Sequence, residues 1–170
     1  TWTLSDGNSD NKWDLAIAAD TTKPTTTFSP VNGATAVAVA SDITLTFNEA
    51  VRLINNSALD DSNVDALITL KENNSSGADI AFNATINGGK TVITINPDSN
   101  LSSTQVVYVA IGATVEDAAN NAINAANVSF TTADVSAPTM TITSAEVSDG
   151  ASSNDSTLSM TFTSSKATSN

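Results

Sequence analysis

Seven short runs of this sequence alternate apolar and polar residues, so that every second residue is hydrophobic. Within residues 42–51, for example, Ile43, Leu45 and Phe47 alternate with threonines. Successive side chains of a β-strand point to opposite faces, so a period of two predicts a strand with one buried face. Their spacing of about 8–12 residues is typical of an antiparallel β-sandwich. The predicted strands occupy residues 24–30, 42–51, 66–72, 79–86, 91–97, 105–112 and 127–133.

Turn-forming residues separate these runs. Residues 87–90 read Asn-Gly-Gly-Lys between two alternating runs, which indicates a β-hairpin because Asn and Gly accept positive φ. Pro24 and Pro30 bracket the first run and favour an edge strand, since proline cannot donate to a sheet ladder. Residues 57–67 and 114–127 do not alternate and are compatible with short helices or loops. Adjacent asparagines in the second of these segments favour an irregular turn.

One connector occurs twice. The sequence ADTTKPT at residues 19–25 returns as ADVSAPT at residues 133–139. The prolines of the two copies, Pro24 and Pro138, are 114 positions apart (138 minus 24). The strand that contains Phe47 is echoed around Phe162, and 162 minus 47 is 115. Two matches at nearly one offset indicate an internal repeat.

The repeat predicts how the chain is divided. We expect residues 1–19 to be the terminal hairpin of a preceding unit and residues 20–134 to form one complete sandwich. Residues 135–170 are then the first two strands of a following unit. The sequence begins with Thr, and no charged-then-apolar leader precedes the first strand, so we expect the chain to be a piece of a longer protein.

Composition and charge exclude several classes of function. Eighteen acidic residues against six basic ones give a net charge of −12, which repels nucleic acids and anionic membrane surfaces. The sequence contains no His and no Cys, which excludes disulfides, His or Cys metal sites and Ser-His-Asp catalysis. No apolar run approaches the ~20 residues needed to cross a bilayer. The abundance of Ser, Thr, Asn and Ala is typical of an extracellular β protein.

Four short motifs follow one another in the sequence: FNEAV (47–51), INPDSNL (95–101), EDAANNAI (116–123) and FTTAD (130–134). This ordered set resembles the bacterial Ig-like domains of S-layer proteins and large adhesins. In that family the corresponding motifs run F-S-E-x-V, I-x-P-x-x-x-L, D-x-x-G-N and F-x-T. The resemblance covers about two-thirds of the chain and implies a Greek-key, Ig-like β-sandwich of about seven strands.

Two positions depart from the family pattern. Asn48 replaces the usual Ser, and Asn120 stands where the family generally has Gly. Asn is the non-glycine residue that best tolerates left-handed backbone, so the second departure is physically mild. The tail at 160–168 resembles a second type of bacterial Ig-like repeat, common in tandem arrays of marine surface proteins.

Acidic residues fall in loops that the strand order places at one pole of the sandwich. Calcium takes six to eight hard oxygens, which carboxylates and loop carbonyls supply. We predict a calcium site at the domain junction from Asp20, Glu49, Glu116 and Asp117, with Asp134 taking the same part for the following unit. Solvated loop acids, with Asp117 capping a turn, are the alternative. The other acids placed at this pole are Asp60, Asp61 and Asp65.

A second cation candidate lies near the start of the chain. Asp6, Asn8 and Asp10 fall at positions 1, 3 and 5 of an EF-hand-like loop, but position 12 is Ile17 rather than Glu, and Gly7 is misplaced. A loop joining two hairpin strands explains the same residues, and we favour it.

Enzymatic function has little support. Glycosidase chemistry needs two carboxylates facing each other about 5–10 Å apart, whereas Asp60 and Asp61 are adjacent and predicted to point apart. No aromatic platform for sugars is evident beside Tyr108, and Trp2 and Trp13 are expected to be core residues. We therefore predict no catalytic residues and no enzymatic activity.

The resemblance implies a structural repeat of an extracellular surface protein, such as an adhesin stalk, S-layer or appendage filament. Expected partners are neighbouring Ig-like units, including head-to-tail copies that complete each other's terminal strands. The alternatives are a module that binds a glycan, a protein or a host surface, and an accessory domain of a secreted hydrolase.

Overall fold

The computed structural model describes residues 2–5, 14–148, 150–154 and 156–167. The chain divides into two compact units, Thr1–Asp134 and Val135–Asn170, which are treated separately below. Among the described residues, none forms a helix with the length and hydrophobicity of a membrane-spanning segment.

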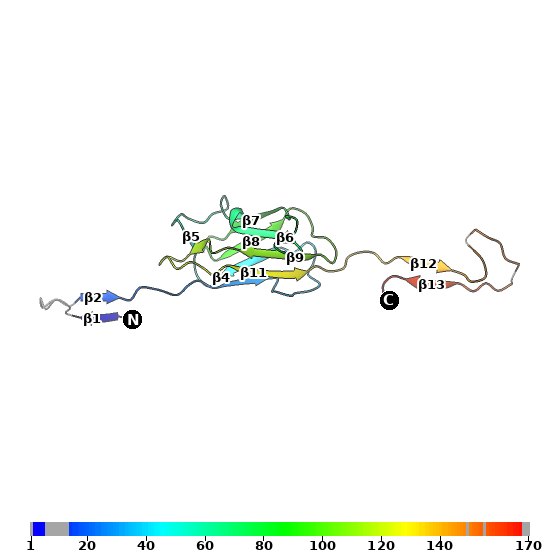
Figure 1. The fold of residues 1–170 in the computed structure, drawn as a ribbon, viewed down its shortest axis with the longest axis horizontal. Helices are drawn as coiled ribbons and strands as arrows, with labels where there is room; N and C mark the ends of the chain where they lie inside the picture. Colours follow the sequence, from blue (N-terminus) through cyan, green and yellow to red (C-terminus); the bar gives the residue numbers. More distant parts are fainter. Residues whose placement is uncertain (1, 6–13, 149, 155, 168–170) are drawn as a thin grey trace. The chain divides into compact units, whose positions relative to one another are not determined.

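The first unit contains a β-sandwich of two antiparallel sheets (Figure 1). The four-stranded sheet has the order β3 (Thr26–Ser29), β4 (Ile43–Phe47), β8 (Val92–Pro97) and β7 (Phe82–Ile86). The three-stranded sheet has the order β11 (Ala126–Thr131), β9 (Val106–Ile111) and β6 (Ile68–Glu72). This is the strand order of a constant-type Ig-like sandwich. The predicted all-β fold and its seven strands are confirmed.

The core lies between the two sheets and comes from the alternation seen in the sequence. Ile43, Leu45 and Phe47 of β4 are buried, while Thr44 and Thr46 between them are more exposed. Phe130 of β11 and Val107 and Val109 of β9 belong to the same buried cluster from the opposite sheet. Burying one such side chain contributes about 1.5–3 kcal/mol. The two-residue period therefore sets both the strands and the buried face.

The Asn-Gly-Gly-Lys segment forms the predicted hairpin, because β7 and β8 pair in antiparallel register. The Asn87 side-chain oxygen accepts the N–H groups of Thr91 and Val92 at 2.8 and 3.1 Å. The first of the two segments without alternation contains a 3-10 turn (η1, Asp65–Leu67), and the second contains the two-residue strand β10 (Val115–Glu116), which pairs with β5 (Arg52–Leu53). Two-residue strands are too short to show a period, so the sequence did not predict them.

Polar contacts cover sheet edges that would otherwise expose backbone donors. On edge strand β7, the N–H of Ala84 donates to the Asp65 carboxylate at 2.6 Å and that of Ile86 to Asp61 at 2.8 Å. Along β6, Ile80 donates its N–H to the carbonyl of Leu70. Unpaired strand edges invite association with other chains, so this cover protects the sandwich.

The chain between β3 and β4 leaves the first sheet and runs parallel to β11 of the second. Four backbone hydrogen bonds of 2.7–3.1 Å join residues 33–37 to residues 129–133. The Asn32 side chain adds a fifth contact, accepting the N–H of Ser129 at 2.9 Å. We call these five bonds the parallel ladder. They tie the beginning of the sandwich to its last strand.

Two further strand pairs lie outside the sandwich. β1 (Trp2–Ser5) pairs antiparallel with β2 (Asp14–Ile17), which confirms the predicted hairpin strands. The EF-hand-like residues at positions 6–13 lie outside the described residues. In the second unit, β12 (Met140–Thr143) pairs antiparallel with β13 (Thr161–Ser164). The assignment of these pairs to a preceding and a following unit stays a prediction.

The register of the second unit differs from the sequence alignment by two residues. The alignment matches Phe162 with Phe47, whereas Phe162 lies opposite Ile142 as Leu45 lies opposite Phe28. A shift of two keeps every side chain on its face, because the side-chain period of a strand is also two. The alternation of apolar and polar residues specifies which face of the sheet a side chain lies on, but it does not specify the register of the strand pairing.

Candidate functional site

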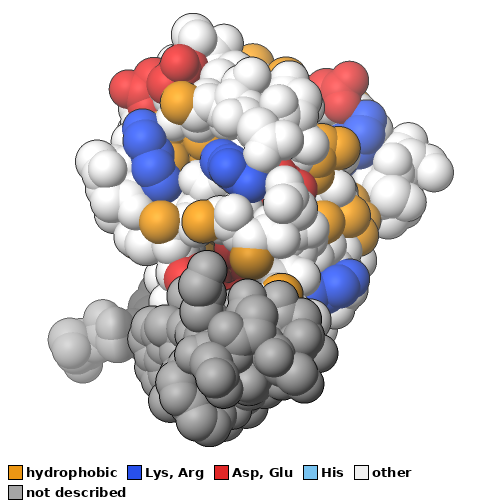
Figure 2. All heavy atoms as spheres, turned by 90° about the vertical axis from the view of Figure 1, so that its left-hand side faces the viewer, with side chains coloured by type: hydrophobic (Ala, Val, Ile, Leu, Met, Phe, Trp, Pro, Cys, Tyr) orange, Lys and Arg blue, Asp and Glu red, His pale blue; other side chains and the backbone are white. Residues whose placement is uncertain are grey.

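The strand order brings one connector and several loops to the same end of the sandwich. β3 and β8 are both antiparallel to β4, so they begin where β4 ends. We call this end the connector pole and the other end, where β11 finishes, the exit pole. The visible part of this face carries scattered acidic and basic side chains among uncharged ones (Figure 2). Any cation affinity must therefore come from a local arrangement of ligands.

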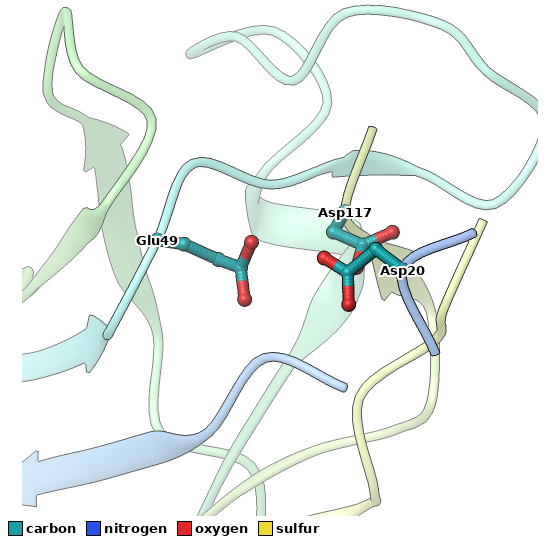
Figure 3. Close-up of side chains that lie close together, drawn as sticks. All are labelled: Asp20, Glu49 and Asp117. Carbon is teal, nitrogen blue, oxygen red and sulfur yellow. The ribbon is translucent and has the colours of Figure 1, made fainter. Parts of the chain in front are cut away.

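Three carboxylates converge at the connector pole. Asp20 lies in the connector, Glu49 follows β4, and Asp117 follows β10. One carboxylate oxygen of each lies within 4.8 Å of the other two. Glu49 points toward the other two side chains from across the site, and Asp20 and Asp117 lie next to each other (Figure 3). Three of the five predicted ligands are therefore neighbours in space.

Asp117 is the most constrained member of the group, with only 2% of its surface exposed. Its Oδ1 accepts the backbone N–H groups of Ala119 and Asn121 at 2.7 and 2.9 Å, and its Oδ2 accepts the Asn121 side-chain amide at 2.9 Å. These Asn121 bonds hold the pKa of Asp117 below its ordinary value, and Ala119 and the Arg52 charge act in the same direction. The carboxylate is thus fixed in its ionised form, with lone pairs left for one more contact.

Asn120 provides the backbone turn that this arrangement needs. Its φ is 69°, in the left-handed region where the family generally has glycine. Its side-chain oxygen accepts a hydrogen bond from Arg52 at 3.0 Å. Asn therefore replaces Gly without loss of the turn and adds a contact that Gly lacks.

The connector is held against the sandwich by two asparagines. The amide of Asn121 donates to the backbone carbonyl of Asp20 at 3.0 Å. Asn48 accepts the N–H of Thr25 through its side chain at 2.6 Å and donates its own N–H to the Thr25 carbonyl at 3.2 Å. A serine side chain is shorter, so Asn48 is suited to bridge this distance. These hydrogen bonds hold Asp20 itself and Asn48, the residue next to Glu49.

Glu116 is placed differently from its neighbour Asp117. It is 5% exposed, and its Oε1 lies 3.2 Å from Nε of Arg52. Arg52 also donates to the carbonyl of Ala118 at 3.3 Å. Glu116 is therefore neutralised within the small β5–β10 sheet and does not belong to the three-carboxylate group. No local pattern signals this pairing, because the two residues are 64 positions apart.

The remaining predicted acids have other partners. Asp134 lies after β11 at the exit pole, and the hydroxyl of Ser103 donates to it at 3.1 Å. Asp60 accepts the hydroxyl and the N–H of Ser62, which lower its pKa. Asp61 and Asp65 cover the edge of β7. Asp60 and Asp61 thus bind separate partners and do not form a facing pair.

The three-carboxylate group has the chemistry of a hard-cation site. Two oxygens bound to one calcium at about 2.4 Å are at most about 4.8 Å apart, which matches the spacing of these ligands. Two like charges 4 Å apart repel each other by about 1 kcal/mol in water and about 4 kcal/mol near a protein surface. A divalent cation removes this repulsion, and backbone carbonyls or water would complete its shell.

Hollows at the exit pole are small. Two of them have volumes of about 200 Å³ each and are lined mainly by polar residues of the loops around Asp98 and Asn100. Small-molecule sites usually have volumes of about 300–1,000 Å³. These hollows therefore add no support for a ligand-binding function.

A family model described as a bacterial Ig-like domain matches residues 20–132. The chain belongs to the bacterial Ig-like domain family. The matched residues begin at Asp20 and so include the connector carboxylate.

Solved structures give more distant similarities to the Ig-like domain. An L,D-transpeptidase from Mycobacterium smegmatis is 18% identical, with 66% of this chain and 41% of that protein covered and a TM-score of 0.42. CopC from Methylosinus trichosporium OB3b is 14% identical, with 65% of this chain and 92% of that protein covered and a TM-score of 0.43. Domains 1–6 of the surface layer protein SbsC are 12% identical, with 71% of this chain and 15% of that protein covered and a TM-score of 0.43. A search of curated proteins finds no significant match.

Proposed function

We propose that the Ig-like domain is a load-bearing structural repeat of an extracellular bacterial surface protein, and that it has no catalytic activity of its own. Family membership supports a surface or accessory module. The repeated connector supports placement in a tandem array, because a similar boundary sequence precedes the domain and follows it.

The observation that carries the mechanical role is the path of the chain through the domain. The chain enters at the connector pole before β3 and leaves at the exit pole after β11. Tension along an array therefore pulls residues 33–37 toward the connector pole and β11 toward the exit pole. The two segments are parallel, so this force shears the parallel ladder along its length. In shear all five bonds carry load together, whereas in peeling they break one at a time.

We further propose that calcium binds Asp20, Glu49 and Asp117 and stiffens the entry of the connector. The spacing of the three oxygens supports this proposal. Asp20 is part of the connector, whereas Glu49 and Asp117 belong to the sandwich, so a shared ion would add a link between them. Glu116 and Asp134 are not needed as ligands of this ion.

Single-molecule pulling of the full chain in two directions tests the mechanical proposal. The chain lacks cysteine, so introduced cysteines provide unique attachment points. Thr21→Cys with Ala137→Cys loads the domain from pole to pole, whereas Thr21→Cys with Gly88→Cys pulls on two points at the connector pole. A Cβ at Gly88 would meet no heavy atom within 4 Å, so this substitution is tolerated.

We expect a higher unfolding force for the pole-to-pole pair at the same loading rate. Asn32→Ala should lower that force, because it removes one bond of the parallel ladder. Asn55→Ala is the matched control, since this exposed asparagine also accepts one backbone N–H but lies in a loop outside the ladder. Equal forces in the two directions would refute a load-bearing role for the ladder.

A further inference from the structure

The dipeptide Asn-Gly occurs twice in the Ig-like domain, as Asn32–Gly33 and as Asn87–Gly88. In this dipeptide the backbone nitrogen of glycine can attack Cγ, the side-chain carbonyl carbon of asparagine. Both atoms belong to the same short stretch of chain, so the reaction needs only bond rotations and no encounter. Glycine has no Cβ to obstruct the approach to its nitrogen. Both dipeptides are exposed, so exposure does not distinguish the two sites.

At the first site the attacking nitrogen is already engaged. The N–H of Gly33 donates to the carbonyl of Ser129 at 2.7 Å, and the Asn32 side chain accepts the N–H of Ser129 at 2.9 Å. Both bonds belong to the parallel ladder. The nitrogen of Gly33 cannot turn toward Cγ of Asn32 without breaking this ladder, so the fold protects Asn32.

At the second site the attacking nitrogen is free. Gly88 lies in the turn between β7 and β8, and among the described residues its N–H has no hydrogen-bond partner. A Cβ placed at Gly88 would meet no heavy atom within 4 Å. Hydroxide from the solvent can therefore reach this N–H, and movement of the nitrogen breaks no hydrogen bond.

The side chain of Asn87 is also held in a way that favours attack. Its Oδ1 accepts the N–H groups of Thr91 and Val92 at 2.8 and 3.1 Å. Attack at Cγ moves negative charge onto this oxygen, and backbone donors at such distances stabilise an oxyanion. Its Nδ2 donates to the hydroxyl of Thr91 at 3.0 Å, which places a proton-exchanging group beside the leaving nitrogen.

We propose that Asn87 is a self-modifying site, which the folded hairpin converts to aspartate and isoaspartate without an enzyme, whereas Asn32 is preserved. The nitrogen of Gly88 forms a bond to Cγ, the Cγ–Nδ2 bond breaks, and Nδ2 leaves as ammonia with the proton that Gly88 loses. Water then opens the cyclic imide. Breaking the new bond at Cγ gives aspartate, and breaking the original peptide bond gives isoaspartate. The inference does not depend on the proposed array.

The isoaspartate product changes the backbone of the hairpin. The main chain then runs through Cγ, which adds one methylene group between β7 and β8. The N–H of Asn87 donates to the carbonyl of Val92, and the N–H of Lys90 donates to the carbonyl of Asn87, both at 3.0 Å. Conversion displaces atoms of both bonds, next to the buried pair Ile86 and Ile93. Isoaspartate should therefore lower the melting temperature of the domain.

Peptide mapping by tandem mass spectrometry tests the proposal. The folded full chain is kept at mildly alkaline pH, sampled over time and digested with trypsin, which places the two sites in different peptides on either side of Arg52. We expect acid to form at position 87 at least about tenfold faster than at position 32, since a preorganised oxyanion donor is worth at least that factor. In denaturant the two rates should converge, because both sites then have the same free dipeptide.

Two glycine substitutions in the same turn separate attack by the backbone nitrogen from general effects on the hairpin. Gly88→Ala places a methyl group next to the attacking nitrogen and should slow conversion of Asn87 by at least about tenfold. Gly89→Ala is the matched control. Its Cβ would lie 3.6 Å from Oγ1 of Thr91 and 3.8 Å from Nδ2 of Asn87, which are ordinary contacts, so it should leave the rate unchanged.

Three outcomes would overturn the inference. One is a folded chain in which Asn87 is protected as strongly as Asn32. Another is equal slowing by Gly88→Ala and Gly89→Ala. The third is a converted fraction at position 87 that forms only when the chain is unfolded. None of these results would alter the directional difference in unfolding force, so failure of this inference and failure of the proposed function are distinguishable.

Discussion

The β3–β4 and β12–β13 pairs share the same alternation of apolar and polar residues but have different surroundings. Both follow the repeated connector, both alternate apolar residues with threonine, and both form antiparallel pairs. In the first pair the apolar residues of β4 are buried, and in the second the equivalent residues are more than half exposed. The comparison shows that alternation specifies a strand and its faces, while burial depends on strands from elsewhere in the chain or from another chain.

The largest expected difference between the two pairs is the loss of stability when one apolar side chain in each is shortened to alanine. Leu45→Ala should destabilise the Ig-like domain by about 2–5 kcal/mol, because it leaves a cavity in the core. Phe162→Ala should leave the stability of the domain unchanged, since Phe162 belongs to the second unit. Chemical denaturation of each variant under conditions where the chain is monomeric measures both values. A large loss of stability from Phe162→Ala would show that the two units fold together.

A smaller effect concerns the covered edge of the sandwich. Asp65→Ala removes the acceptor of the Ala84 N–H on β7 and should cost about 1–3 kcal/mol if the donor is left without a partner. Asp79→Ala is the control, because it removes only the exposed partner of Lys71 and should cost about 0–1 kcal/mol. Denaturant unfolding gives both numbers, and an equal cost would argue against a role for Asp65 in protecting the edge.

Calcium should stabilise the domain that contains β3–β4 and not the β12–β13 pair, because the three carboxylates lie around the connector that precedes β3. At ten times its dissociation constant, calcium should raise the stability of the domain by about 1.4 kcal/mol, seen as a higher melting temperature. Glu49→Gln should reduce this response, whereas Asp79→Asn should not. The calcium proposal fails if millimolar calcium leaves the melting temperature of the wild-type chain unchanged.

The smallest expected effect is a pH dependence from Asp117. Its pKa in the folded state is below the ordinary value of 3.8, so its ionised form favours folding. This contribution is fully present above the unfolded pKa, near pH 4, and is lost as the pH falls through the lower folded pKa. Asn121→Ala removes the side-chain amide that donates to Asp117 but keeps the backbone N–H of residue 121, so it should partly flatten this acid limb of the stability profile. If the loss of stability at acid pH is the same in this variant, other carboxylates dominate the acid dependence.

Much of this architecture could be predicted because it depends on local patterns. The period of two gives the seven strands, and the order of the loops places Asp20, Glu49 and Asp117 at one pole. The pairing of Glu116 with Arg52 and the covering of β7 by Asp61 and Asp65 could not be predicted, because they depend on tertiary contacts between separate segments. The two-residue shift of β13 was also beyond prediction, since alternation is unchanged by a shift of two.

The parallel ladder also has a consequence for synthesis of the protein. Asn32 and its partner Ser129 are 97 positions apart, and the ladder joins nearly the first and the last residues of the domain. Translation proceeds from the N-terminus at about 5–20 residues per second, so residues 33–37 wait several seconds for the strand that completes them. In the proposed tandem array, a similar segment of a neighbouring repeat would compete for the open position during that interval. Differences between successive repeats, such as those between the two connectors, are then an advantage for correct assembly.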